Sequence, residues 1–179
     1  MSDIGSVHIY VDGSCSENRN VTSETSAGWG LCVIVNDSGS GNGKGHLLTE
    51  LNGEVVTNAD ETGYLGAEVG SNNTAELSAI AHALRWILSE SAVESATIRG
   101  DSNYALNIAS GLWTAKANQA LASRVRDLWD EVSGIVGLVG EHVPAHRGHR
   151  WNERADHLAF RAMQGEPPLP LQFWKPGQR

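Results

Sequence analysis

The stretch ATIRGDSNYALNIAS, residues 96–110, changes its hydrophobic pattern half-way along. Its first part, residues 96–102, has the pattern of a short buried strand that ends at Asp101, and NYALNIAS continues with apolar residues at helical spacing. A strand that passes directly into a helix is typical of layered α/β proteins. We therefore predict an α/β fold.

The stretches on either side continue this alternation of strands and helices. Strands are predicted over residues 7–12, 27–35 and 137–143, of which the first two should form an antiparallel pair. Helices are predicted from Asn73 to about Glu90, from Leu121 to Val132, and over residues 152–163 with Asn152 as the N-cap.

Two segments do not fit the regular pattern. Residues 36–70 hold eight of the twenty glycines and are too long for an ordinary connection, so we predict an extra strand or hairpin within them. Residues 165–179 hold four of the five prolines and should form an extended tail rather than a helix. Phe173 and Trp174 of this tail either dock on the body or a partner, or belong to a disordered end. We accordingly expect one domain, residues 1–164 with 36–70 as an acidic, glycine-rich insertion, followed by the Pro-rich C-terminal tail.

The composition is that of a soluble globular protein, with 179 residues and 40% hydrophobic content. Neither a signal-like start nor a run of roughly eighteen apolar residues is present, so we expect a cytoplasmic protein without membrane contact. Cys15 and Cys32 are the two cysteines. Their spacing fits neither a disulfide scaffold nor a paired metal site, so both should be free thiols.

The net charge of −8 argues against nucleic acid as a partner, because phosphate neutralisation supplies most non-specific affinity. The charge is unevenly distributed, however. Residues 36–70 hold six acidic residues against Lys44 alone, whereas residues 142–161 hold four arginines against two acidic residues, together with four of the seven histidines. A local positive field around residues 142–161 is therefore expected.

Four acidic residues lie where predicted strands or helices begin or end: Asp12, Glu76, Asp101 and Asp156. Carboxylates gathered from distant parts of a chain repel one another unless divalent cations neutralise them, and oxygen ligands favour magnesium or manganese. Two such ions at one site are typical of phosphodiester hydrolysis. Taken singly, Asp12 could instead belong to a turn and Asp156 could favour a helix N-terminus. Glu76 could be the capping-box partner of Asn73.

Four short stretches resemble a known family. YVDGSCSEN (10–18), SNNTAEL (71–77), RGDSNYAL (99–106) and HRGHRWNERADHLA (146–159) are similar to the four signature segments of type 1 ribonuclease H, in the same order and with similar spacing. The resemblance implies a ribonuclease H-like fold, with a central five-stranded mixed sheet flanked by helices. It also implies an endoribonuclease that cleaves the RNA strand of RNA/DNA hybrids by two-metal-ion hydrolysis and leaves 5′-phosphate and 3′-hydroxyl ends. The implied cofactor is Mg²⁺, as two ions, with Mn²⁺ as a substitute.

The resemblance assigns roles to the motif residues. Asp12 would bridge the two ions and Asp156 would help hold the ion that activates water. Glu76 and Asp101 would hold the ion near the leaving oxygen. His146, ten residues before Asp156, matches a loop histidine that assists water activation or product departure. The residues expected to line the groove and contact substrate are Cys15, Asn18, Ser71, Asn72, Asn73 and Asn103, and family members often carry Gln at the position of Asn103.

One family feature has no counterpart in this sequence. Many members carry a lysine- and tryptophan-rich protrusion after the motif around Asp101, whereas here GLWTAKANQAL passes directly into the next helix. Trp113 is either what remains of that DNA-facing surface or a core residue beside Trp129. His149 and His157 match no family position and should be incidental. Two other functions stay open, a related metal nuclease acting on structured DNA or double-stranded RNA, and a catalytically silent hybrid-binding module. No protein partner can be named for the tail or for residues 36–70.

Overall fold

The computed structural model describes residues 4–179 and contains one five-stranded mixed sheet, as predicted. The strands are β1 (Gly5–Cys15), β2 (Ala27–Val35), β3 (His46–Glu54), β4 (Val93–Gly100) and β5 (Gly137–His142). The helices are α1 (Asn72–Ser89), α2 (Asn103–Ala109), α3 (Gln119–Ser133) and α4 (Arg150–Gln164), followed by the short 3-10 turn η1 (Leu171–Phe173). Within residues 4–179 no helix is long and apolar enough to cross a bilayer.

The strand order β3-β2-β1-β4-β5 places β1 at the centre of the sheet. β1 pairs antiparallel with β2, which confirms the predicted pair, and β2 pairs antiparallel with β3. β4 and β5 extend the other side in parallel, each reached through crossover helices. β3 confirms the strand predicted within residues 36–70, and it forms one edge of the sheet.

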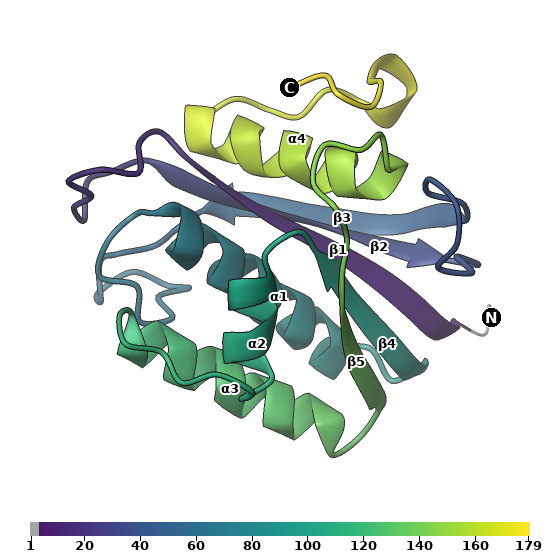
Figure 1. Cartoon of the computed structure of the whole chain (residues 1–179), viewed down its shortest axis with the longest axis horizontal. Coiled ribbons are helices and arrows are strands. Elements are labelled where there is room, and N and C mark those ends of the chain that lie inside the picture. Colours follow the sequence, from purple (N-terminus) through teal and green to yellow (C-terminus); the bar gives the residue numbers. More distant parts are fainter. Residues whose placement is uncertain (1–3) are drawn as a thin grey trace.

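Helices cover both faces of the sheet, with α1, α2 and α3 on one face and α4 on the other (Figure 1). The alternation of side chains along β1 explains the two layers. Val7, Ile9 and Val11 point into the larger core with α1 and α3. Tyr10 points into the smaller core with Trp151 of α4. β1 is therefore buried on both faces, as a central strand should be.

Glycines let two helices lie directly on the sheet. A Cβ on Gly30 of β2 would lie 2.6 Å from the carbonyl oxygen of Ala155 in α4. On the opposite face, a Cβ on Gly13 of β1 would lie 2.5 Å from the backbone nitrogen of Glu76. Any side chain at residue 13 would push α1 away. The glycine after Asp12 is therefore what brings the start of α1 against β1.

Two predicted features near the first motifs are wrong. β1 continues to residue 15, so Asp12 lies inside the strand and not at its end. The N-cap of α1 is Ser71, whose hydroxyl accepts the backbone N–H of Thr74 at 3.1 Å while the Thr74 side chain accepts the backbone N–H of Ser71. This reciprocal pair excludes a capping box between Asn73 and Glu76. The carboxylate of Glu76 is therefore free for another role.

The start of the last helix also differs from the prediction. α4 begins at Arg150 with His149 as its N-cap, so Asn152 is not the cap. The imidazole of His149 accepts the backbone N–H of Asn152 at 3.4 Å. The amide side chain of Asn152 is left for other contacts. Because the helix starts earlier, Asp156 lies in its second turn rather than in its opening turn.

The tail folds back onto the body. Trp174 is 5% exposed and its ring centre lies 5.9 Å from that of His157, so the docking alternative is correct for Trp174. Phe173 is 69% exposed and does not dock. The tail is not one extended segment, because η1 interrupts it and the backbone N–H of Gln178 donates to the carbonyl of Lys175 at 3.0 Å to close a turn. It forms no α-helix, as its prolines predict.

Candidate active site

Three carboxylates from separate elements meet beside the end of β4. Val11 of β1 pairs with Gly100, the last residue of the parallel strand β4. The residues that come next in the chain, Asp12 and Asp101, therefore lie side by side. Glu76 reaches the same place from the start of α1, which Gly13 allows to lie close to β1. Oxygen atoms of Asp12, Glu76 and Asp101 lie within 4.8 Å of one another. The fold thus assembles a cluster that no local stretch of sequence contains.

Burial and mutual repulsion disfavour the charges of this cluster. Burial raises the pKa of Asp12 well above its ordinary value, and the nearby carboxylate of Glu76 raises it further. Burial also raises the pKa of Glu76, to about 8. The pKa of Asp101 is raised by burial as well, against an opposing effect of nearby His146. A site that destabilises its own carboxylates in this way is stabilised by a cation.

Asp156, the fourth predicted ligand, lies on α4 next to the cluster. Its negative charge raises the pKa of Asp12 further. Its carboxylate is paired within the chain. Arg179 donates from Nε to Oδ2 at 3.1 Å and from Nη2 to Oδ1 at 2.9 Å. The structure therefore brings three of the four predicted ligands into one cluster and places the fourth against an arginine.

Asn152 also faces the cluster, although its position in the sequence indicated only a helix cap. It is 2% exposed, and a hydrogen bond from its side chain opposes the raised pKa of Asp101. Its Oδ1 is buried without a partner in the described part of the chain. A hydrated divalent cation fits these groups, because carboxylate oxygens suit it as ligands and the orphaned Oδ1 can accept a hydrogen bond from a hydration water.

Comparison with known proteins identifies the family. The sequence matches the RNase H family over residues 5–164. The chain belongs to the ribonuclease H family. It is 29% identical over 165 residues to the ribonuclease H of Ruegeria sp. (strain TM1040), covering 86% of this chain and 88% of the relative. It is 30% identical over 166 residues to the ribonuclease H of Roseobacter denitrificans, covering 86% and 93%.

Solved structures share the fold of this ribonuclease H. RNase H1 from the halophilic archaeon Halobacterium salinarum NRC-1 has a TM-score of 0.64 at 24% identity, covering 90% of this chain and 99% of the other. LC11-RNase H1 in complex with an RNA/DNA hybrid has a TM-score of 0.62 at 21% identity, covering 89% and 97%. The predicted fold and enzyme class are confirmed.

The residues predicted to contact substrate in this ribonuclease H lie within six positions of Asp12, Glu76 or Asp101 along the chain. They are polar side chains at the end of β1 and at the starts of α1 and α2. A hydrogen bond between the backbone of Asn72 and the Cys15 thiol joins the first two groups, and the thiol donates to Oδ1 of Asn18 at 2.9 Å. Ser71 caps α1, and the exposed members are Asn18, Asn72, Asn73 and Asn103.

His146 lies in the exposed loop between β5 and α4, with a left-handed φ of 52°. This conformation is uncommon for a non-glycine residue, although histidine adopts it more often than most. Three residues further on, His149 anchors the end of the loop, because its Nε2 lies 3.3 Å from the hydroxyl of Tyr10. That hydroxyl also bonds Asp37 and Arg99. His149 is therefore not incidental, since it caps α4 and fixes the loop that carries His146.

The predicted positive field around residues 142–161 is weaker than the count of arginines indicates. Arg154, with a side chain 1% exposed, donates to both carboxylate oxygens of Glu50 at 2.6 and 2.8 Å. Arg161 forms an ion pair with Glu166 of the tail, with its Nη1 3.0 Å from Oε2 of the carboxylate. Two of the four arginines in this region are thus neutralised by neighbours, and Glu50 is a structural residue rather than part of a repulsive surface.

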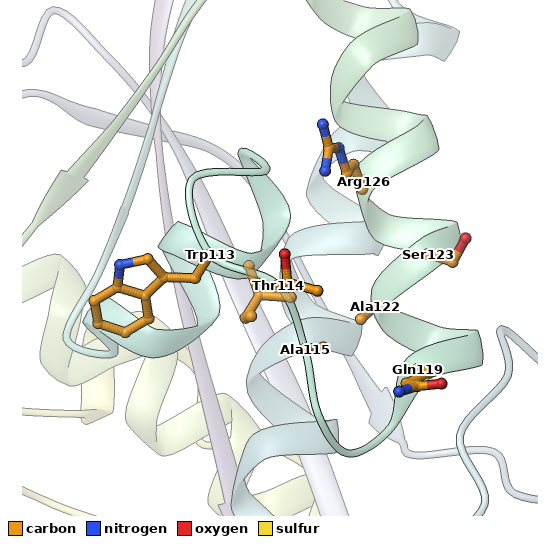
Figure 2. A pocket seen from close by; sticks show the side chains of 8 residues that line it. Trp113, Thr114, Ala115, Gln119, Ala122, Ser123 and Arg126 are labelled. Carbon is orange, nitrogen blue, oxygen red and sulfur yellow. The ribbon is translucent and has the colours of Figure 1, made fainter.

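Trp113 lies between α2 and α3, and its side chain extends away from α3 (Figure 2). It is 49% exposed whereas Trp129 is 7% exposed, so the alternative of a core tryptophan beside Trp129 is wrong. The residues that follow Trp113 form a pocket of about 380 Å³ with α3, with Arg126 on its wall. A DNA-facing role for Trp113, and the absence of a basic protrusion, stay predictions.

Proposed function

We propose that this ribonuclease H cleaves the RNA strand of RNA/DNA hybrids with two Mg²⁺ ions held by Asp12, Glu76, Asp101 and Asp156, leaving 5′-phosphate and 3′-hydroxyl ends. The observation that carries the proposal is the convergence of the first three carboxylates within 4.8 Å at a buried position. Mn²⁺ should substitute for Mg²⁺, because it accepts the same oxygen ligands.

We assign the four carboxylates to the two ions as the family resemblance implies. Asp12 would contribute to both, Glu76 and Asp101 to one, and Asp156 to the other. When bound, the ions neutralise phosphate charge, orient the scissile bond and lower the pKa of the attacking water. The chain contributes rigidity, because β1 is paired with β2 at Asp12 and with β4 up to Val11, and α1 is packed directly against it.

We infer that His146 moves protons beside the carboxylates. It is exposed, and it lies near enough to Asp101 to affect the pKa of that carboxyl. An imidazole can accept or donate a proton near neutral pH. We assign His146 an auxiliary role in water activation or product departure, on a loop that His149 holds in place.

We assign recognition of the hybrid to the polar side chains at the end of β1 and at the starts of α1 and α2. Only the RNA strand carries 2′-hydroxyls, which both donate and accept hydrogen bonds, and amide side chains can do the same. Asn72, Asn73 and Asn103 are exposed at helix starts and suit this task. Ser71 lies at the N-terminus of α1, where a DNA phosphate would be favoured. Cys15 and Asn18 complete the proposed contact surface.

A cleavage assay on defined substrates tests the proposal. Labelled RNA/DNA, RNA/RNA, DNA/DNA and single-stranded RNA are incubated with the chain in Mg²⁺, Mn²⁺ or EDTA. We expect cleavage of the hybrid only, lost in EDTA and abolished in a folded Asp12→Asn variant. The matched control is Asp127→Asn, which removes an exposed carboxylate on α3 and should keep the wild-type rate. Cleavage of RNA/RNA or DNA would point to another nuclease class, and hybrid binding without cleavage to a silent module.

We propose residues 1–164 as the catalytic domain, residues 165–179 as a separate tail, and the cytoplasm as the location. Within residues 36–70, β3 belongs to the central sheet, so an insertion is limited to the loops on either side of it. Limited proteolysis with mass determination would test this division, since cuts should fall in those loops and not in β3.

A further inference from the structure

The tail runs back over the face of α4 that points away from the sheet (Figure 1). Arg154 donates to the carbonyl of Leu169 at 2.9 Å, and the backbone N–H of Leu169 donates to Nε2 of His157 at 3.0 Å. Further along, Trp174 is buried, with its ring centre 5.3 Å from the guanidinium carbon of Arg154. The tail therefore has anchors on α4 that are independent of its last residues.

The docked tail carries Arg179 to a proposed metal ligand. The guanidinium makes two parallel hydrogen bonds to the carboxylate of Asp156, at 2.9 and 3.1 Å, the arrangement in which arginine binds a carboxylate most specifically. It also lies 4.8 Å from the ring centre of Phe160. The side chain of Asp156 is 8% exposed and that of Arg179 is 47% exposed. The pair thus lies at the mouth of the site, within reach of solvent.

We propose that Arg179 is the resident counter-cation of Asp156, which a divalent cation must displace before Asp156 can coordinate it. Both carboxylate oxygens accept hydrogen bonds from Arg179, so a metal ion would have to compete with the fork for the lone pairs that face the guanidinium. A guanidinium and a divalent cation on one carboxylate would also repel each other. The inference rests on the proposed two-ion site and adds a residue that sets its cation affinity.

The remaining carboxylates are not blocked in this way. Within residues 4–179, no arginine or lysine forms an ion pair with Asp12, Glu76 or Asp101. These three can receive a cation without a rearrangement of the tail. The position that uses Asp156 should fill at higher cation concentration, because that step includes breaking the pair with Arg179.

Isothermal titration of the full chain with MnCl₂, without hybrid, measures this directly. Arg179→Gln should tighten the weaker cation site by about two- to tenfold, the range expected for losing a partly exposed ion pair. The matched control is Lys175→Gln, which removes one positive charge from an exposed tail residue that makes no contact with the carboxylates. It should bind Mn²⁺ as the wild type does. A merely structural role for Arg179 would lower the melting temperature without tightening cation binding.

A second measurement follows Arg179 itself. In the wild-type chain, the NMR signal of its Nε–H should shift as MgCl₂ saturates the site, because the bond to Asp156 is broken. An unmoved signal at saturation, together with wild-type affinity in Arg179→Gln, overturns the inference. Cation binding that survives in Asp12→Asn instead overturns the proposed metal site. If Arg179→Gln binds cations measurably and the wild type does not, the inference is supported. If neither the wild type nor Arg179→Gln binds cations, both the proposed metal site and the role of Arg179 are wrong.

Discussion

Without divalent cations, the folded state of this ribonuclease H should lose stability as the pH rises from 6.5 to 8. Burial raises the pKa of Glu76 from 4.5 to about 8, so the folded chain keeps a proton that the unfolded chain has already released. A group with a raised pKa stabilises the fold fully below its unfolded-state pKa, and that contribution is lost as the pH rises through the folded-state pKa. Asp12, whose pKa is also raised, acts in the same direction.

Two other kinds of group bear on this window. Several histidines have lowered pKa values because of burial, and each makes stability rise with pH, mostly below the ordinary value of 6.5 and by a few tenths of a kcal/mol above it, so they offset only part of the decline. Burial raises the pKa of both thiols above 9, so these matter only at higher pH. Each retained proton changes the free energy of unfolding by up to about 1.36 kcal/mol per pH unit. Allowing for titration near 8, the loss should be about 1.5 kcal/mol for Glu76 alone, and Asp12 adds to it in the same direction.

Urea denaturation in EDTA, at several pH values between 6.5 and 8, measures this loss. MgCl₂ should remove most of the decline, because the ion takes over the neutralisation that the proton provides. Asp12→Asn should flatten the decline and raise the stability at the upper end, since one carboxyl of the crowded pair is gone. Asp127→Asn, exposed on α3, should show the wild-type decline. A pH dependence in EDTA that is the same in the wild type and in Asp12→Asn would refute the carboxylate crowding.

Three further outcomes follow from the site. His146→Ala should slow hybrid turnover by about 10- to 1,000-fold without abolishing it, and comparing single-turnover with steady-state rates separates proton transfer from product departure. Gly13→Ala should cost about 1–3 kcal/mol of stability and reduce cleavage, because the new methyl would lie 2.5 Å from the backbone nitrogen of Glu76; urea denaturation and cleavage rates check both. Asp60→Asn with Glu61→Gln removes two exposed charges and should tighten hybrid binding by about two- to threefold at low salt, with no effect at high salt, in titrations at several salt concentrations.

Local sequence patterns anticipated most of the elements because each depends on neighbours along the chain. Alternating side chains marked β1 and β2, and apolar spacing marked α1 and α3. Boundaries were less predictable, since several side chains can cap the same helix. Ser71 with Thr74 caps α1 and His149 caps α4, and only the packing of the surrounding loops decides between such candidates and Asn73 or Asn152.

The sequence by itself determined the family and the identity of the carboxylates, because Asp12, Glu76 and Asp101 are each embedded in a short motif whose local conformation is strongly constrained. Tertiary structure decided what surrounds those carboxylates. The burial that raises their pKa values comes from elements distant in sequence. Likewise, the pair between Asp156 and Arg179 exists because the tail docks along α4 and brings together residues 23 positions apart. Such contacts depend on the path of the chain in space. The residues around Asp156 or around Arg179, taken alone, do not specify that path.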